Sequence, residues 1–376
     1  MNLEKNPGLY IHIPFCLSKC HYCDFYSSTS VSIVSDFLNA LFKEMEMYRN
    51  RFKAFDTVCF GGGTPSLLSP KQLKDILITV QKNFDLTANT EITIETNPAD
   101  LDQSSLESMR RMGINRINIG VQSFDEKVLP FLGRRHSAKQ AISAIEASRK
   151  GGFENIGLDL IYGVPGQEMN SWLNTLRQAV AFSPEHLSCY QLTLEAETPF
   201  GIRYRAGEFL MPGEELQYQF FVKTSQFLED AGYVRYEVSN FARGMEHASK
   251  HNQKYWDHSP YLGLGPSAHS FQNNCRWWNR RSVDQYIPAI AAGNLPVEET
   301  ETLTREQLRL EALYLGLRTK KGVNFEDFKN RYRYDLLTEK KEMIEKLREE
   351  GFISIHDGRL YPTQAGLAVA DSLALI

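Results

Sequence analysis

The stretch HIPFCLSKCHYCDFYS, residues 12–27, places Cys16, Cys20 and Cys23 within eight residues. Three and then two residues separate these cysteines, so three thiolates share one tight loop. A compact loop of this kind can coordinate three irons of a cubane iron–sulfur cluster and leave the fourth iron open. Because such clusters and tetrahedral metal sites usually take four protein ligands, the fourth position has to be explained.

Zinc is the alternative to a cluster, with His12 or His21 as its fourth ligand. Structural zinc sites usually take paired ligands from two separated segments, and the sequence has no second CxxC pair. The cysteine loop also follows the first predicted strand of an α/β domain, where ligands gather. The pattern therefore favours the cluster over zinc.

The whole chain has 376 residues, 42% of them hydrophobic, which is enough for a large core and for more than one domain. Its net charge is −4 with both signs interspersed, so we expect no nucleic-acid partner. Residues 1–15 lack the features of a signal peptide, and no apolar run reaches the ~20 residues that span a bilayer. We therefore expect a cytoplasmic protein with no integral membrane segment. Its thiols should stay reduced, and the isolated Cys59, Cys189 and Cys275 are predicted to be small buried hydrophobic residues.

Short apolar runs alternate with longer amphipathic stretches from residue 8 to about residue 195. Several of the amphipathic stretches start with Ser, Asp or Pro or end on glycine, as capped helices do. Six strand–helix units predict a parallel sheet, because parallel strands need helical crossovers. Six units are too few for a closed eightfold barrel, so we expect an α/β fold with an open three-quarter (β/α)6 barrel. The predicted strands are LYIHI (9–13), TVCF (57–60), EITIE (91–95), RINIG (116–120), NIGLDLIYG (155–163) and HLSCYQL (186–192).

Polar residues stand within these strands or just after them. The carboxyl ends of parallel strands form the ligand-binding face of α/β sheets. We therefore predict one binding site along this rim of the barrel. Besides the cysteines, its polar residues are the GGGT of 61–64, Glu95, Asn97, Gln122, Ser123, Asp159, Gln191 and Thr193.

The sequence changes character after about residue 200, where a predicted helix precedes an aromatic-rich region. The last part, 345–376, predicts a helix, a hairpin with Asp357-Gly358 at its turn, and a further helix. This pattern is typical of a winged-helix-like α+β domain, and its balanced charge favours a packing or partner role over DNA binding. The predicted domains are the partial barrel (1–200), a barrel extension (201–300) and the winged-helix-like domain (301–376).

The motif CxxxCxxC after the first strand, with Tyr22 before its last cysteine, resembles the radical S-adenosylmethionine (SAM) superfamily. The similarity extends over nearly the whole chain to the oxygen-independent coproporphyrinogen oxidase-like family. It implies a [4Fe–4S] cluster whose open iron is chelated by SAM, which would supply the missing fourth ligand. It also implies a flavodoxin- or ferredoxin-like electron donor. The matching segments are LYIHIPFC, FGGGTPSLL, TIETNP, NIGVQSF, LDLIYGVPGQ and HNQKYW.

The resemblance further implies which residues of this chain bind SAM. Gly62, Gly63 and Thr64 would flank its methionine part, where glycine lets the backbone approach closely, and Tyr10 would lie beside them. The other implied contacts are Glu95 and Gln122 to the ribose and amino groups, Arg134, in preference to Arg135, to the carboxylate, Asp159 to a ribose hydroxyl, and Thr193 near the adenosine. No catalytic residue is implied beyond the cluster.

Two branches of this family differ in function. One oxidatively decarboxylates coproporphyrinogen III to protoporphyrinogen IX, and its members resemble CxxxCxxCxC with a longer N-terminal arm. Here Phe25 stands at the place of the extra cysteine, and about nine residues precede the first predicted strand. The other branch binds haem and hands it to acceptor proteins, and HNQKYW (251–256) fits its HNxxYW signature. The resemblance favours the haem chaperone, with the dehydrogenase as the alternative.

His251 is the natural candidate for an axial haem ligand, because imidazole binds haem iron well. Tyr255 and Trp256 would flank the porphyrin face. In the alternative interpretation this segment packs on the barrel and His251 makes an ordinary hydrogen bond. The branch also implies a haem-acceptor protein as partner and leaves room for a homodimer formed on haem binding. The other candidate ligands are His247, His258 and His269.

Overall fold

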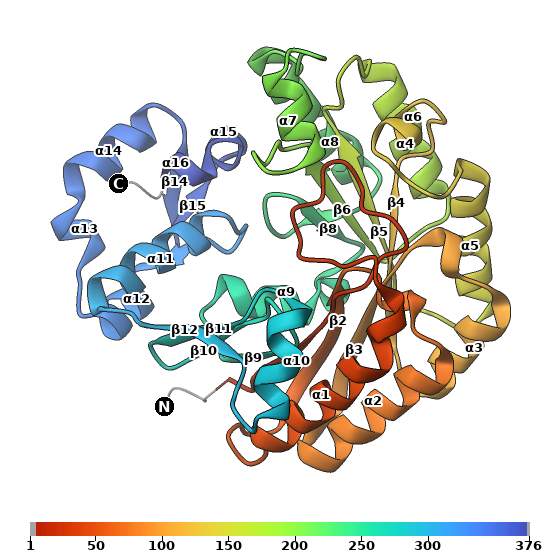
Figure 1. The fold of residues 1–376 in the computed structure, drawn as a ribbon. Coiled ribbons are helices and arrows are strands. Elements are labelled where there is room, and N and C mark those ends of the chain that lie inside the picture. The colour runs from red at the N-terminus through yellow and green to blue at the C-terminus, as the bar shows by residue number, and fades with distance from the viewer. Residues whose placement is uncertain (1–4, 374–376) are drawn as a thin grey trace.

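The computed structural model describes residues 5–373 and contains a twelve-stranded sheet at whose centre lie six parallel strands in sequence order (Figure 1). Each of the six predicted strands is confirmed, and so is the open, partial barrel, because the sheet ends in antiparallel edge strands on both sides. The parallel strands are β1 (Gly8–Ile13), β2 (Phe55–Gly62), β3 (Leu86–Thr96), β4 (Arg116–Gln122), β5 (Ile156–Tyr162) and β6 (His186–Gln191).

Helices connect these strands and cover the outer face of the barrel (Figure 1). Ser69, Asp102 and Ser137 each form a capping box at a helix start, which satisfies backbone N–H groups that have no partner within the helix. The polar residues at the starts of the predicted helices are therefore N-caps in the structure. The helices are α1 (Val34–Met47), α2 (Pro70–Asn83), α3 (Gln103–Arg111), α4 (Val128–Phe131), α5 (Ala138–Lys150) and α6 (Met169–Ala181).

Residues 199–302 widen the same sheet at both edges. On one side β9 (Tyr261–Leu264) pairs with β1, and β10 (His269–Gln272), β11 (Cys275–Asn279) and β12 (Val297–Thr302) follow in antiparallel order. On the other side β8 (Asn240–Ala242) pairs with β6, and β7 (Val234–Arg235) pairs with β8. The helices of this region are α7 (Pro199–Arg205), α8 (Glu214–Asp230), α9 (Lys250–Trp256) and α10 (Val283–Ala291).

The strands alternate between the core under the helices and the inside of the barrel. In β1, Leu9, Ile11 and Ile13 are fully buried in the main hydrophobic core, whereas Tyr10 and His12 line an interior cavity. This alternation follows from the period of two of a β-strand. The inward polar residues of these strands therefore gather inside the barrel, and many of them line this cavity.

The C-terminal part has a core of its own, built from residues between Leu313 and Leu373. Its hairpin turns at Asp357 and Gly358, both at positive φ (51° and 69°), as the sequence predicted. The arrangement of helices around a small three-stranded sheet confirms the winged-helix-like domain. Its elements are α11 (Arg305–Leu317), β13 (Val323–Asn324), α12 (Phe325–Tyr332), α13 (Leu336–Glu339), α14 (Lys341–Glu349), β14 (Ile353–His356), β15 (Arg359–Pro362), α15 (Gln364–Ala368) and α16 (Ala370–Leu373).

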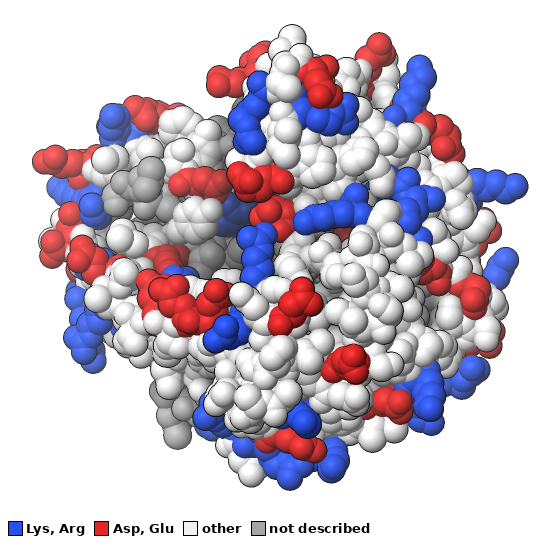
Figure 2. Space-filling view, viewed as in Figure 1, with Lys and Arg blue, Asp and Glu red and all other residues white. Residues whose placement is uncertain are grey.

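Backbone hydrogen bonds attach this domain to the edge of the barrel. The Val238 N–H donates to the Arg318 carbonyl (3.0 Å), and the Lys320 N–H donates to the Tyr236 carbonyl (3.1 Å). Acidic and basic side chains are intermixed over the face in Figure 2, with no expanse of one sign. No helix among residues 5–373 is long and apolar enough to cross a membrane.

The isolated cysteines differ from one another. Cys59 and Cys189 are buried as expected, and Cys59 lines the interior cavity. The prediction was wrong for Cys275, which is only partly buried because it lies on β11, near the edge of the sheet.

Glu44 is a fully buried carboxylate of α1 that fixes the loop between β9 and β10. It accepts hydrogen bonds from the Gly265 N–H (2.8 Å), the Asn279 amide (2.6 Å) and the Tyr286 hydroxyl (2.6 Å). Burial raises its pKa to about 7 despite these donors. This loop forms part of the wall of the interior cavity, so Glu44 stabilises that wall although it does not line the cavity itself.

We expect Glu44→Gln to lower the free energy of unfolding by about 1–3 kcal/mol, because a glutamine NH2 would face the Asn279 amide, donor against donor. Since the folded state raises the pKa of Glu44, its contribution to stability is full below pH ~4.5 and is lost as the pH rises through about 7. Denaturant titrations of both proteins across this range measure the difference. A difference that does not shrink as the pH rises would contradict this role.

Candidate functional site

A cavity of about 1570 Å³ runs from the carboxyl ends of the parallel strands into the barrel interior. Side chains from all six strands line it, together with the cysteine loop, β11 and residues 367–372 of the C-terminal domain. Its volume exceeds the roughly 300–1,000 Å³ of a pocket for one drug-sized ligand. The carboxyl ends of the six strands therefore border one continuous space with room for more than one small molecule, although Ser123 of the predicted rim is buried outside its lining.

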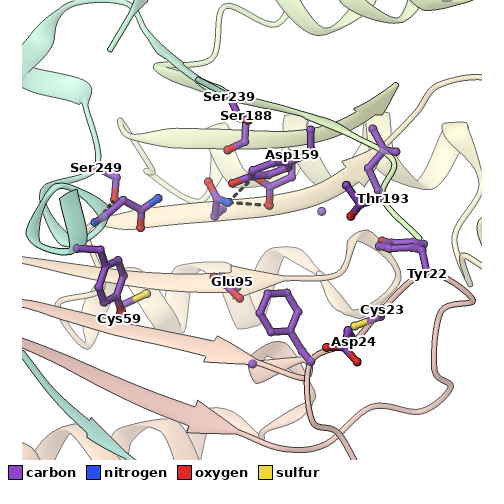
Figure 3. A pocket seen from close by; sticks show the side chains of 18 of the residues that line it. Tyr22, Cys23, Asp24, Cys59, Glu95, Asp159, Ser188, Thr193, Ser239 and Ser249 are labelled. Carbon is purple, nitrogen blue, oxygen red and sulfur yellow. Dashed lines mark hydrogen bonds between the residues drawn. The ribbon is translucent and has the colours of Figure 1, made fainter. Parts of the chain in front are cut away.

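The cysteine loop forms one end of this cavity and is anchored at several points. The Cys16 N–H donates to the Ser28 carbonyl (3.0 Å), and the Cys23 N–H donates to the Cys20 carbonyl (3.2 Å). Burial, with a further contribution from the other two thiols, raises the pKa of Cys23 to about 11. The three thiols thus share one loop and influence one another electrostatically. Figure 3 shows Cys23 beside Tyr22 and Asp24 at this end.

Two side chains from outside the cysteine loop, one just after β2 and one after α4, contact the sulfurs. The Thr64 hydroxyl lies 3.3 Å from Cys16 Sγ, and Arg134 Nη1 donates to Cys20 Sγ at 3.3 Å. Arg134 Nε is buried and has no hydrogen-bond partner among residues 5–373, although the cavity lies directly beside it. A guanidinium group and a hydroxyl next to three thiols suit an anionic cluster with an anionic ligand group beside it.

The zinc alternative finds less support in the structure. His12 has both ring nitrogens engaged, Nδ1 with the Tyr10 hydroxyl (3.2 Å) and Nε2 with the Tyr26 carbonyl (2.9 Å). His21 Nδ1 lies 3.0 Å from the Phe131 carbonyl. To complete a zinc site, His12 would have to give up one of its two hydrogen bonds.

The glycine-rich segment after β2 packs directly against the start of the cysteine loop. The Gly63 N–H donates to the Ile13 carbonyl, and the Thr64 N–H donates to the Phe15 carbonyl, both at 2.8 Å. A Cβ at Gly63 would meet the Phe15 backbone at 2.6 Å, and Gly62 has a φ of 104° that disfavours other residues. Glycine is therefore required at both positions for this close approach.

Two carboxylates, Glu95 and Asp159, face the cavity from neighbouring parts of the barrel (Figure 3). Burial raises the pKa of Glu95 to about 7, and the charge of Asp159 adds to the effect. Burial also raises the pKa of Asp159, although the Asn118 amide donates to both of its carboxylate oxygens at 2.8 and 2.7 Å. Two carboxylates that are costly to ionise in one enclosed space suit a cationic ligand.

All nine residues predicted for SAM line this cavity, which are Tyr10, Gly62, Gly63, Thr64, Glu95, Gln122, Arg134, Asp159 and Thr193. Gln122 has a φ of 63° at an irregularity in the β4–β5 pairing. The two adjacent arginines have different surroundings. Arg134 lines the cavity, whereas Arg135 lies outside the lining and forms a salt bridge with Asp100 (2.9 Å).

The HNQKYW segment is a helix, α9, and it does not present His251 to the cavity. His251 is 1% exposed, and its ring nitrogens lie 2.8 Å from the Thr57 hydroxyl and 2.9 Å from the Tyr255 hydroxyl. Burial lowers its pKa to about 3. Tyr255 lines the cavity floor, whereas Trp256 is not part of the lining and lies under the guanidinium of Arg318, 5.6 Å from its ring centroid. This arrangement matches the alternative interpretation, in which the HNQKYW segment packs on the barrel and His251 makes ordinary hydrogen bonds.

Several cavity residues had no place in the sequence-based site. Arg116, Asn118, His186 and Ser188 face inward from β4 and β6, and their alternation with apolar neighbours was the available signal. Arg318 and residues 367–372 come from the C-terminal domain, and no pattern in the sequence pointed to them. The same holds for Trp278 and Arg281 at the β11 wall.

Comparison with known proteins places the chain among relatives of similar length. Residues 10–179 match the radical SAM superfamily, and residues 303–369 match the HemN C-terminal domain. Proteins named heme chaperone HemW are 35% identical in Bacillus subtilis, covering 95% of both chains, and 33% identical in Lactococcus lactis, covering 99% of this chain and 97% of the relative. The solved structure of coproporphyrinogen III oxidase (HemN) from Escherichia coli has the same fold, with a TM-score of 0.86 over 99% of this chain and 90% of that one, at 22% identity.

Proposed function

This chain belongs to the haem chaperone HemW branch of the coproporphyrinogen oxidase-like family, within the radical SAM superfamily, and from that premise we propose that it carries haem. In this proposal it binds a [4Fe–4S] cluster through Cys16, Cys20 and Cys23, and binds SAM and haem in the adjoining cavity. It then delivers haem to an acceptor protein. Two relatives that are named heme chaperone, and that match this chain over nearly their full length, support this function.

The observation that carries the proposal is the cavity that begins at the three thiols and continues well beyond the predicted SAM residues. One SAM molecule beside the cysteine loop would leave the part of the cavity next to β11 and the C-terminal domain free. A second, larger ligand is therefore expected there.

The chain's own residues would hold SAM in a fixed orientation. Arg134 would bind its carboxylate next to Cys20, and Glu95 would attract its positive charge. When bound, the reduced cluster supplies the electron that can split the sulfonium of SAM, and a flavodoxin- or ferredoxin-like protein would reduce the cluster. The barrel's contribution is position and exclusion of water.

The alternative function is oxidation of coproporphyrinogen III, which the fold of the Escherichia coli enzyme keeps open. Phe25, where dehydrogenase relatives have a further cysteine, speaks against it. The deciding experiment is an anaerobic assay of the reconstituted protein with coproporphyrinogen III, SAM and dithionite. We expect no protoporphyrinogen IX together with saturable haem binding. Turnover to protoporphyrinogen would contradict a carrier-only function.

SAM binding should tighten as the pH rises through about 7. Glu95 has its pKa raised to about 7 by burial, so it is largely protonated below this pH and attracts the positively charged amino group of SAM poorly. We expect the SAM dissociation constant to rise by up to ~10-fold per pH unit below about pH 7. Equilibrium dialysis with labelled SAM measures this dependence, and Glu95→Gln should bind more weakly with a flatter pH profile. Equal slopes in both proteins would contradict the role of Glu95.

A further inference from the structure

We propose that His269 is the axial ligand of the haem iron, with Trp278 beside the porphyrin and Arg281 pairing with a propionate. This inference rests on the proposed function, since it assumes that the cavity takes haem. It replaces His251 as the iron ligand and moves the haem site from α9 to the strand wall formed by β10 and β11.

Three histidines line the cavity, which are His12, His186 and His269. Both ring nitrogens of His12 are engaged in hydrogen bonds. His186 Nε2 lies 2.7 Å from the Tyr236 hydroxyl, and its Nδ1, although without a partner among residues 5–373, is fully buried. His269 is exposed, and neither of its nitrogens has a hydrogen-bond partner among those residues. Of these three rings, His269 is therefore the one that combines an exposed side chain with free nitrogens, so an iron that enters the cavity can reach it.

The surroundings of His269 also suit a haem ligand. It pairs across the strands with Trp278, and the two rings stack with centroids 5.6 Å apart and planes inclined by 27°. Stacking holds the imidazole without using its nitrogens, and the indole adds a flat apolar surface suited to a porphyrin.

The charges near this wall also suit a haem. A haem carries two propionates, and the wall that holds His269 and Trp278 also carries Arg281. Arg281 is 65% exposed, and its contact with Asp24 is long at 3.8 Å. Exposed ion pairs of this kind contribute little, so the guanidinium is free to turn to a propionate. Asp24 and Glu298 also line the cavity, and Arg281 offsets the repulsion between these carboxylates and a propionate.

The contacts of α9 give its HNQKYW segment a structural role that does not require His251 to bind the haem iron. His251 joins β2 to Tyr255 through two hydrogen bonds, and Lys254 forms a salt bridge with Asp56 (2.5 Å) and donates to the Asn6 carbonyl (2.8 Å). The helix therefore seals the barrel at the end of the strands opposite the cysteine loop. His251 is a positioning residue in this account, because its ring supports Tyr255 at the cavity floor.

The test is a haem titration of the reconstituted full-length protein, followed through the Soret absorbance, for the wild type and four variants. His269→Gly should lose the spectrum of a histidine-ligated haem and bind haem at least ~10-fold more weakly, and added imidazole should restore the spectrum. Arg281→Ala should weaken binding without changing the spectrum. His251→Ala should unfold at a lower temperature but keep the wild-type spectrum while folded. His356→Ala, an exposed hairpin histidine outside the cavity lining, is the matched control.

The possible outcomes separate the two proposals. If the wild type binds no haem, the proposed function fails and this inference fails with it. If the wild type binds haem and His269→Gly keeps its spectrum and affinity, the function stands and the assignment of His269 is wrong. A spectrum lost in folded His251→Ala and kept in His269→Gly would return the ligand to α9. Failure of imidazole to rescue His269→Gly would reduce His269 to a structural role.

Discussion

Replacing any one of Cys16, Cys20 and Cys23 by alanine is expected to abolish the iron–sulfur cluster. Each thiolate would hold one iron, and the structure offers no substitute, since Cys59 lies deep in the barrel with its pKa raised well above the usual value by burial. Iron and sulfide content after anaerobic reconstitution, with the visible absorbance of the cluster, measures the effect. We expect nearly complete loss in each single variant.

Cys275→Ala provides the control for this prediction. Cys275 is a partly buried thiol on β11 and does not line the cavity, so its loss should leave iron, sulfide and absorbance unchanged. A protein in which one of the loop cysteines could be removed without loss of iron would not fit a three-cysteine cluster. Zinc in near-stoichiometric amount without iron would likewise overturn it.

The second large effect is expected for Gly63→Ala. The added methyl group would approach the Phe15 nitrogen at 2.8 Å and the Ile13 and Phe15 carbonyl oxygens at 2.9 and 2.6 Å. These are backbone atoms at the start of the cysteine loop, so the loop or the glycine segment has to move. Overpacking of this kind costs about 1–3 kcal/mol, and we expect SAM affinity to fall by at least ~10-fold.

Gly213→Ala is the matched control for Gly63→Ala. Gly213 precedes α8 with a φ of −62°, and a Cβ there would meet nothing within 4 Å. Its SAM dissociation constant should equal that of the wild type in the same dialysis experiment. Equal SAM affinity of Gly63→Ala and the wild type would show that the glycine segment does not position SAM.

The strands and the rim of polar residues were predictable because both depend on local patterns. A strand buried on both faces has a short apolar run, and an inward polar residue interrupts it at a period of two, as Glu95 and Asp159 do. The cysteine spacing and the glycine segment are likewise contained within a few residues. The sequence therefore predicted many of the barrel residues that line the cavity, but not Arg116, Asn118, His186 and Ser188.

Contacts between distant segments were not predictable in this way. The sequence of the aromatic HNQKYW segment predicted a ligand site. In the structure it forms a helix that places His251 against Thr57 of β2, 194 positions away. The approach of residues 367–372 to the cavity depends on how a separate domain docks on Tyr236 and Val238. Such packing results from the summed tertiary contacts, which no single window of sequence contains.

The central claim is that SAM completes the coordination of a three-cysteine cluster at the open end of this cavity. Electron paramagnetic resonance of the reduced, reconstituted protein before and after addition of SAM tests it most directly. The account predicts a [4Fe–4S]⁺ signal that changes on addition of SAM and saturates at one equivalent per chain. A cluster signal identical with and without SAM, in protein that binds SAM by dialysis, would contradict it.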